Sequence, residues 1–228
     1  DGGWLMPFSG KGILTHPLVA SNCAYHIDWP EVFLDKNEGK AIKNIVISCN
    51  EGTQKGEVVV TRQGIEGNAI YALSDQIQKE LTNGRQAKIE VDLKKQLSEI
   101  EVFNKLFNSS LNTTTTLKKI LNLSGVQIDL LRVMLTKKEF VNKKVLAKRI
   151  KRFPLFINAS GPIDQAISTT GGIALTALTN NFELKHLKAH YCIGEMLDWN
   201  APTGGYLIQG CASMGVSLAR VLNSKKCT

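Results

Sequence analysis

The last third of the chain holds the feature that most limits its fold: a short apolar run, a glycine–acid pair, and a glycine turn that leads into a helix. Residues 191–193 form the apolar run and predict a strand, which Gly194 and Glu195 follow directly. Gly204 and Gly205 precede apolar residues at helical spacing, so we expect a helix to begin right after them. Glycines let the backbone approach a ligand closely, and the first N–H groups of a helix have no partner within it. A strand, turn and helix of this kind suit a nucleotide-like ligand with an anionic or electron-rich group.

Hydrophobic periodicity predicts the other elements. Helices are expected over residues 67–81, ending before Asn83, and in the lysine-rich stretch 94–150. Pro154 favours an extended sheet edge at residues 153–157. Strands are expected at residues 13–18, 23–27, 42–48, 57–61 and 87–93. Loops, caps or breaks are expected at residues 35–40, 113–116 and 122–125.

Four further blocks of sequence carry a resemblance to a known family. They are DGGW at residues 1–4, SNCAY at 21–25 with Trp29, GEVVVT at 56–61 continuing into GIEGNAIYALS at 64–74, and AISTTGG at 166–172. Together with residues 194–207, these blocks resemble the flavoproteins described as NAD(FAD)-utilising dehydrogenases. That family is a branch of the glutathione-reductase-like FAD fold, related to aminoacetone oxidase and to bile-acid reductase-type flavoproteins.

The resemblance implies an α/β fold with an α+β insert. The main domain would be a partial glutathione-reductase-like FAD domain that lacks its N-terminal Rossmann segment. Residues 1–12 would be a remnant of this FAD domain, and residues 154–228 its carboxyl-terminal segment. Residues 13–153 would form the inserted domain, which is β-rich with one helix over 13–93 and helical and basic over 94–153.

The glycine fingerprint that seats the pyrophosphate of FAD, G-x-G-x-x-G after a strand, does not occur in these 228 residues. The nearest string, Gly10-Lys11-Gly12, lacks the third glycine and follows no apolar strand, so we expect a turn there. We therefore expect the chain to be the carboxyl-terminal part of a longer flavoprotein, and to be inactive by itself.

The same resemblance implies which residues contact the cofactor. Glu195 would accept hydrogen bonds from ribityl hydroxyls, and Asp198 would order the turn or contact the cofactor. The turn and the helix N-terminus would face the N1–C2=O edge of the flavin, where N–H donors and the helix dipole stabilise the negative charge of the reduced form. Many relatives carry asparagine where this chain has Leu207, so the catalytic residues, the substrate and the electron acceptor stay open. The cofactor-binding set is Thr170, Gly171, Gly172, Gly194, Glu195, Asp198, Thr203, Gly204, Gly205, Tyr206 and Leu207.

The implied activity is that of an FAD-dependent oxidoreductase. It would transfer a hydride equivalent between flavin and a small organic substrate or NAD(P)H. Composition is ordinary for a globular protein: the chain is 43% hydrophobic and 21% charged, and no apolar run approaches the roughly 20 residues of a membrane helix. Five cysteines without C-x-x-C spacing argue against a disulfide framework and a zinc site, and they fit a reducing cytoplasm.

A basic cluster between residues 137 and 152 supports an alternative function. Such a patch can bind RNA or another anionic partner. The sequence shows neither a nucleic-acid-binding module nor an aromatic stacking platform, so a solvated helix face is the simpler interpretation. The cluster comprises Lys137, Lys138, Lys143, Lys144, Lys148, Arg149, Lys151 and Arg152, with Glu139 as its one acid.

Overall fold

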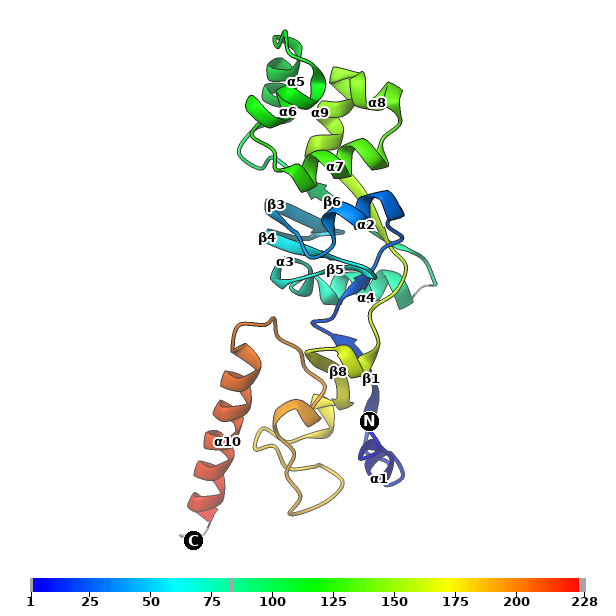
Figure 1. The fold of residues 1–228 in the computed structure, drawn as a ribbon. Helices are drawn as coiled ribbons and strands as arrows, with labels where there is room; N and C mark the ends of the chain where they lie inside the picture. Colours follow the sequence, from blue (N-terminus) through cyan, green and yellow to red (C-terminus); the bar gives the residue numbers. More distant parts are fainter. Residues whose placement is uncertain (1, 83, 226–228) are drawn as a thin grey trace. The chain divides into compact units, whose positions relative to one another are not determined.

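A computed structural model describes residues 2–82 and 84–225 of the chain (Figure 1). Asp1, in the first block of the resemblance, and Asn83, at the predicted helix stop, lie outside the described residues. The chain divides into two compact units. The central unit is Ala24–Gly161, and the terminal unit combines Asp1–Cys23 with Pro162–Thr228.

The central unit is built on a six-stranded antiparallel sheet with the strand order β2-β5-β4-β3-β6-β7. Side chains alternate along the strands as expected for a sheet with one buried face: in β6, Ala87, Ile89 and Val91 are buried and their neighbours are not. The strands are β2 (Tyr25–His26), β3 (Ala41–Cys49), β4 (Gly52–Thr61), β5 (Gly64–Glu66), β6 (Ala87–Asp92) and β7 (Phe153–Ile157).

The two ends of this sheet meet, so that the sheet curls on itself. The His26 N–H donates to the Ala159 carbonyl at 2.8 Å, and the Asn158 N–H donates to the His26 carbonyl at 2.9 Å. The Gly161 N–H donates to the Ala24 carbonyl at 2.7 Å. These bonds join β2 to the residues just after β7, and they place the entry and the exit of the central unit side by side.

Gly64 permits the close approach of β5 to β2. Its φ is +155°, and a Cβ at this position would collide with the carbonyl oxygen of Tyr25. The Gly64 carbonyl in turn accepts a hydrogen bond from the indole Nε1–H of Trp29 at 2.9 Å. The buried Trp29 ring then contacts Phe33 at a centroid distance of 5.0 Å, which holds α2 (Glu31–Asn37) to the sheet.

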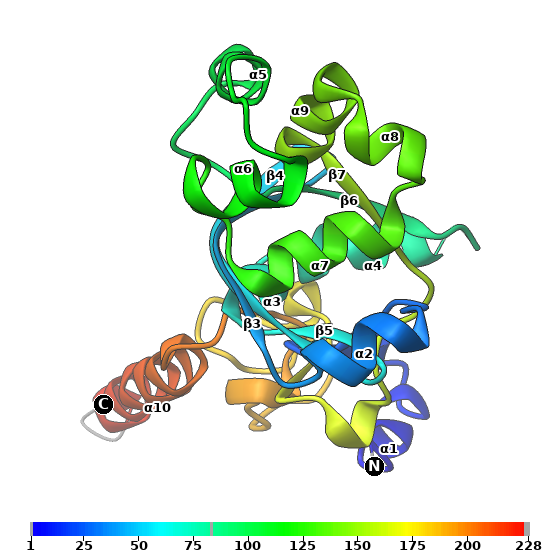
Figure 2. The ribbon, with the colours of Figure 1, turned by 45° about the horizontal axis from the view of Figure 1, so that its top comes forward.

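Five helices follow β6 and lie together on one side of the sheet (Figure 2). Capping boxes begin three of them, at Ser98, Ser124 and Thr136. Hydrogen bonds from Ser98 hold the pKa of Glu101 below its usual value, and those from Thr136 do the same for the pKa of Glu139. The helices are α5 (Glu99–Phe107), α6 (Thr113–Lys119), α7 (Gly125–Met134), α8 (Lys137–Val141) and α9 (Lys143–Lys151).

A largely buried lysine fastens α9 to the end of β6. The Lys151 Nζ lies 2.6 Å from the Asp92 carboxylate and also donates to the carbonyls of Lys94 and Leu97. Its side chain is only 13% exposed. Lys151, one of the basic residues singled out in the sequence, therefore has a structural function.

The terminal unit has less regular structure. Its small core consists of Ile13, Ile173, Leu178, Leu184, Cys192 and Leu197. Burial raises the pKa of the Cys192 thiol, as expected for a cysteine that packs in a core. No helix among the described residues is long and apolar enough to cross a membrane. Its helices are α1 (Leu5–Ser9) and α10 (Tyr206–Lys225), and its strands are β1 (Thr15–Ser21) and β8 (Ser168–Ile173). Its short 3-10 turns are η1 (Ile163–Gln165), η2 (Leu175–Ala177) and η3 (Gly194–Met196).

Most of the predicted elements of the central unit are confirmed, with four differences. The predicted loop at residues 35–40 is partly helical, because α2 extends to Asn37. The predicted helix over 67–81 is two helices, α3 (Asn68–Tyr71) and α4 (Ser74–Thr82). Residues 113–116 are the first turn of α6, capped by Asn112, and β5 was not predicted at all. The break at residues 122–125, the strand at 153–157 and the turn at Gly10–Gly12 are present.

The boundaries of the compact units differ from the domain limits predicted at residues 13 and 153. Residues 13–23 belong to the terminal unit because β1 pairs with β8. Residues 154–161 belong to the central unit because β7 pairs with β6 and the residues after it bond to β2.

Replacing Lys151 by methionine should destabilise the central unit by about 3 kcal/mol, because the Asp92 carboxylate loses the cation that compensates its burial. The matched variant Lys148→Met, one turn away and exposed, should change stability little. Urea unfolding followed by far-UV circular dichroism measures both. Equal effects would show that the ion pair does not anchor α9.

Residues 24–161 produced alone should fold and unfold cooperatively, because their ends are hydrogen-bonded to each other. A shorter fragment, residues 28–157, lacks the bonds that join the ends of the sheet and should be clearly less stable. Urea midpoints of the two fragments test this. Equal midpoints would mean that sheet closure contributes nothing to stability.

Candidate cofactor site

Two adjacent glycines of β8 lie where only glycine fits. Gly171 has a φ of +90°, and a Cβ there would collide with the Pro17 carbonyl oxygen of β1. Gly172 has a φ of +115°, and a Cβ there would lie 2.5 Å from the Met196 carbonyl oxygen. Both glycines are buried. They allow three stretches of backbone to converge, and this convergence is a structural reason for the predicted Thr170-Gly171-Gly172 motif.

Asp198 holds this glycine segment in place. Its Oδ1 accepts a hydrogen bond from the Gly171 N–H at 3.0 Å, and its own N–H donates to the Ile173 carbonyl at 2.8 Å. Its Oδ2 lies 3.7 Å from the Nε2 of His16, which comes from β1. Asp198 therefore orders the backbone of β8, and it brings an exposed imidazole beside the glycine pair.

The strand predicted at residues 191–193 is wrong. Only an isolated bridge between Glu183 and Tyr191 forms there, and Gly194–Met196 is the 3-10 turn η3. Gly194 has a φ of +74°, and its carbonyl accepts hydrogen bonds from the Leu197 N–H and from the Trp199 indole. Local hydrogen bonds thus replace strand pairing, and they leave the Glu195 side chain exposed at a turn rather than at a strand end.

The predicted turn and helix after it are present. Gly204 and Gly205 have φ values of +106° and +93°, and α10 begins at Tyr206. The Gly205 carbonyl accepts the Gln209 N–H at 2.9 Å, which closes the first helical turn. A Cβ at Gly205 would meet no atom within 4 Å, and Tyr206 is 63% exposed, so this turn is open. Its φ values, not lack of space, explain the glycines.

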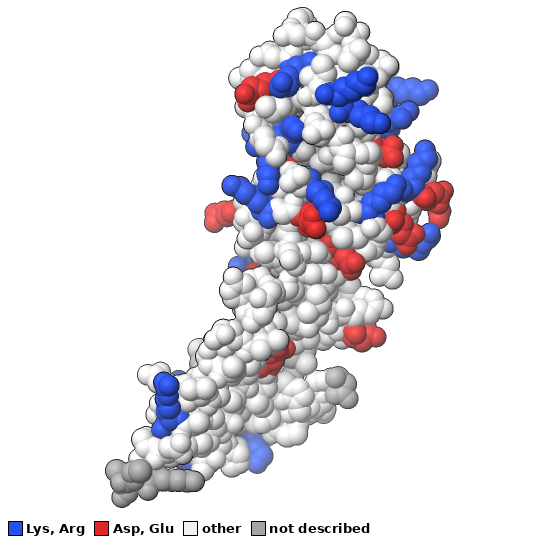
Figure 3. Space-filling view, turned by 60° about the vertical axis from the view of Figure 1, so that its left-hand side comes forward, with Lys and Arg blue, Asp and Glu red and all other residues white. Residues whose placement is uncertain are grey.

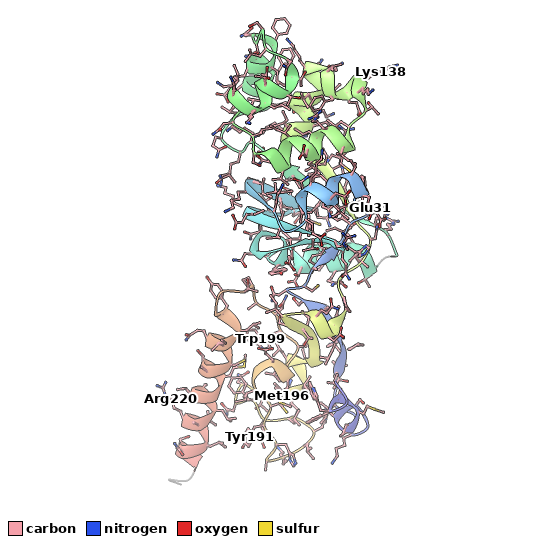
Figure 4. The ribbon with its side chains drawn as sticks, in the orientation of Figure 1. Glu31, Lys138, Tyr191, Met196, Trp199 and Arg220 are labelled. Carbon is pink, nitrogen blue, oxygen red and sulfur yellow. The ribbon has the colours of Figure 1, made fainter. Side chains whose placement is uncertain are left out.

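α10 packs against η3 and the residues after it. A Cβ at Gly210 would lie 2.5 Å from the Trp199 ring, so the helix approaches that ring closely. The Gly194 N–H points to the Met214 sulfur at 3.3 Å. Trp199 and Met196 lie in the segment beside α10, whereas Arg220 projects from the other side of the helix (Figure 4). The Gly194–Met214 contact therefore links η3 to α10.

Asn22 organises the approach to α10, and sequence reasoning did not assign it this function. It is fully buried with a φ of +48°. Its Nδ2 donates to the Ser168 hydroxyl at 2.7 Å and to the Ala201 carbonyl at 2.9 Å. Asn22 therefore connects the end of β1, the start of β8 and the segment that leads to Thr203. The resemblance blocks contained Asn22 and Ser168, but their residues are far apart in the sequence and gave no sign of this bond.

The predicted residues thus fall into connected and unconnected groups. Gly171, Gly172, Gly194 and Asp198 share one network of backbone contacts around η3. Thr203 and Leu207 are half-buried at the turn that Asn22 approaches through Ala201. Glu195, Gly204, Gly205 and Tyr206 are exposed. Within the described residues, no group of three or more His, Cys, Asp or Glu side chains could hold a metal ion.

The terminal unit offers two features to a ligand. The open turn presents the first N–H groups of a 20-residue helix. Separately, the glycine pair of β8 removes side chains where backbones converge, and Asp198 fixes that strand through the Gly171 N–H. A helix N-terminus of this length favours negative charge nearby. The residues present therefore fit the flavin end of FAD, whereas the sequence contains no fingerprint for its pyrophosphate.

Comparison with known proteins identifies the family of the chain. A search of curated proteins gave no match. The family model described as "HI0933-like protein barrel and H2TH domain" matches residues 19–168, which include the curled sheet and the five helices that follow β6. The match covers more than half of the chain and ends before η3 and α10. The chain therefore belongs to the HI0933-like family, a family of FAD-dependent oxidoreductase-related proteins.

Proposed function

We propose that the chain is part of an FAD-dependent oxidoreductase, and that its terminal unit supplies the flavin-facing side of the cofactor site. The enzyme would transfer a hydride equivalent between flavin and a small organic substrate or NAD(P)H. The observation that carries the proposal is the buried Gly171-Gly172 pair fixed by Asp198, in a chain of a flavoprotein-related family. FAD, when bound, supplies the redox chemistry itself.

The chain's own residues would hold and orient the flavin end of the cofactor. The first N–H groups of α10 and its dipole would stabilise negative charge at the open turn. Asp198 would act on the backbone, because its carboxylate already accepts the Gly171 N–H. Exposed Glu195 would accept hydrogen bonds from the ribityl hydroxyls, as the family resemblance implies. None of these functions requires a nucleophile on the protein.

The pyrophosphate end would be held by a glycine-rich strand, turn and helix outside these 228 residues. We base this on the sequence, which contains no G-x-G-x-x-G string. The chain alone should therefore bind FAD weakly and should not turn over substrate.

Binding of flavin by the open turn can be tested with FAD, through its visible absorption and fluorescence, in a protein that carries this chain together with a glycine-rich FAD segment. The variant Gly205→Val should weaken FAD binding at least about tenfold, because valine strongly disfavours a φ of +93°. The matched control is Gly215→Val, which lies within α10 with no atom near its Cβ and no positive φ. Unchanged FAD binding by Gly205→Val would remove the turn from the site, and a protein without any flavin spectrum would contradict the proposed activity.

Asn22 should set the geometry of the segment before the turn. Asn22→Gly removes the amide but tolerates the φ of +48°, and it should destabilise the terminal unit by about 1–3 kcal/mol, since the Ala201 carbonyl and Ser168 hydroxyl lose their donor. Asn22→Ala should cost about 1 kcal/mol more, because alanine is strained at positive φ. Thermal unfolding measures both, and FAD affinity should fall with them. Two variants as stable as the parent would show that the amide is not holding Ala201.

A further inference from the structure

An aromatic pair with one exposed ring and one half-buried ring lies on the helical part of the central unit. Phe103 and Phe107 of α5 stack with ring centroids 5.6 Å apart and an interplanar angle of 30°. Phe107 is 63% exposed, and Ile100, one turn before Phe103 in the same helix, is 72% exposed. Phe107 and Ile100 thus add exposed apolar surface to a helix whose neighbour α9 carries lysines.

Lysines of α9 border this aromatic pair. The Lys143 Nζ lies 5.6 Å from the centroid of Phe107 and donates to the Phe107 carbonyl at 3.2 Å. Lys144 lines a groove of about 270 Å³ together with Phe103, Ile100, Glu99 and Ala147. Lys148 follows Lys144 by one helical turn and is also exposed.

The structure separates the basic cluster into side chains that pair with a carboxylate and side chains that do not. Arg149 pairs with Glu139 at 3.2 Å, and Lys151 is paired with Asp92. Within the part of the chain that the structure describes, Lys144 and Lys148 form no ion pair with a carboxylate. Lys and Arg side chains gather on the central unit in the space-filling view (Figure 3). The sequence alone shows no aromatic stacking platform beside the basic cluster, whereas in the fold α5 packs against α9 and Phe107 lies next to Lys143.

We propose that this α5–α9 face binds single-stranded nucleic acid. A base would stack on the exposed Phe107 ring, and Lys143, Lys144 and Lys148 would bind the phosphates on either side. Aromatic rings beside a row of cations are the usual basis of sequence-tolerant single-strand binding, because every base has a flat face. This proposal is independent of the flavin site.

The face suits a nucleic acid better than an acidic amphipathic helix. Such a helix needs a long apolar groove that receives anchors at successive turns. The groove between α5 and α9 is lined by only five residues, too few to receive anchors at successive turns. A flat base needs only the ring, and its phosphates need only the lysines beside it.

The test uses the whole chain and fluorescently labelled oligouridylate and oligothymidylate, with binding followed by anisotropy at several salt concentrations. Phe107→Ala should weaken binding about tenfold, the usual loss of one stacked base. The triple variant Lys143→Gln, Lys144→Gln and Lys148→Gln should weaken binding further. It should also make the slope of log affinity against log salt concentration shallower by about two, at about 0.7 for each lost phosphate contact. In Phe107→Trp, binding should persist and the added indole should be quenched when the base stacks on it.

Matched controls separate the face from the general positive charge. Phe156→Ala removes another exposed phenylalanine of the same unit, and Lys36→Gln, Lys40→Gln and Lys55→Gln remove three exposed lysines elsewhere on it. Both controls should bind as the parent does. The proposal is overturned if neither oligonucleotide binds, or if the site and control variants lose equal affinity. It is also overturned if a duplex binds with the same affinity as a single strand, or if polyglutamate displaces the oligonucleotide. A preference between the two oligonucleotides distinguishes RNA from DNA.

Discussion

The hydrogen bonds that join the two ends of the six-stranded sheet are the interaction on which the rest of the molecule depends. They leave β2 and the residues after β7 without an open edge at that point, and an open edge would invite pairing with other chains. They also return the chain to the place where it entered the central unit, at Ala24 and Gly161. The strands that flank these two residues, β1 and β8, then pair with each other, and β8 carries the glycine pair of the candidate cofactor site. The close approach of β5 at Gly64 completes the arrangement, because any side chain there would meet the Tyr25 carbonyl.

Periodicity predicted the elements whose stability comes from a buried apolar face. The long strands β3, β4 and β6 and the helices between β6 and β7 were identified because burial alternates along them or recurs at each turn. The short strand β5 and the α2 helix escaped prediction, since each depends on contacts made through Gly64 and Trp29 rather than on its own pattern. The apolar run at residues 191–193 predicted a strand for a related reason: Cys192 is buried in a core to which loops contribute most residues and a strand contributes only Ile173.

The candidate sites divide in the same way. The glycine turn before α10 was predictable, because positive φ values demand glycine and the helical spacing follows at once. The Asn22 bonds were not, since they join residues more than a hundred positions apart. The basic cluster shows the limits of composition most clearly. Lys148 and Lys151 look alike in the sequence, yet one is exposed and the other is held by a carboxylate and two carbonyls. Phe103 and Phe107 are four residues apart on one helix, a spacing that places two side chains side by side, so the sequence did contain a sign of the aromatic pair.

The adjacency of Ala24 and Gly161 also has a consequence for the order of folding. Ser21 and Ser168 bond across 147 positions of the sequence, and closing so long a loop directly is entropically costly and slow. Once the curled sheet has formed, only a few residues separate each of these serines from Ala24 or Gly161, which are hydrogen-bonded to each other. The β1–β8 ladder then forms as a local event, late in folding and at little entropic cost. A mutation that disrupts the sheet would accordingly disturb the geometry of the distant glycine pair. Weaker ligand binding in a variant of the central unit would therefore reflect misfolding rather than a direct function of the mutated residue at the candidate site.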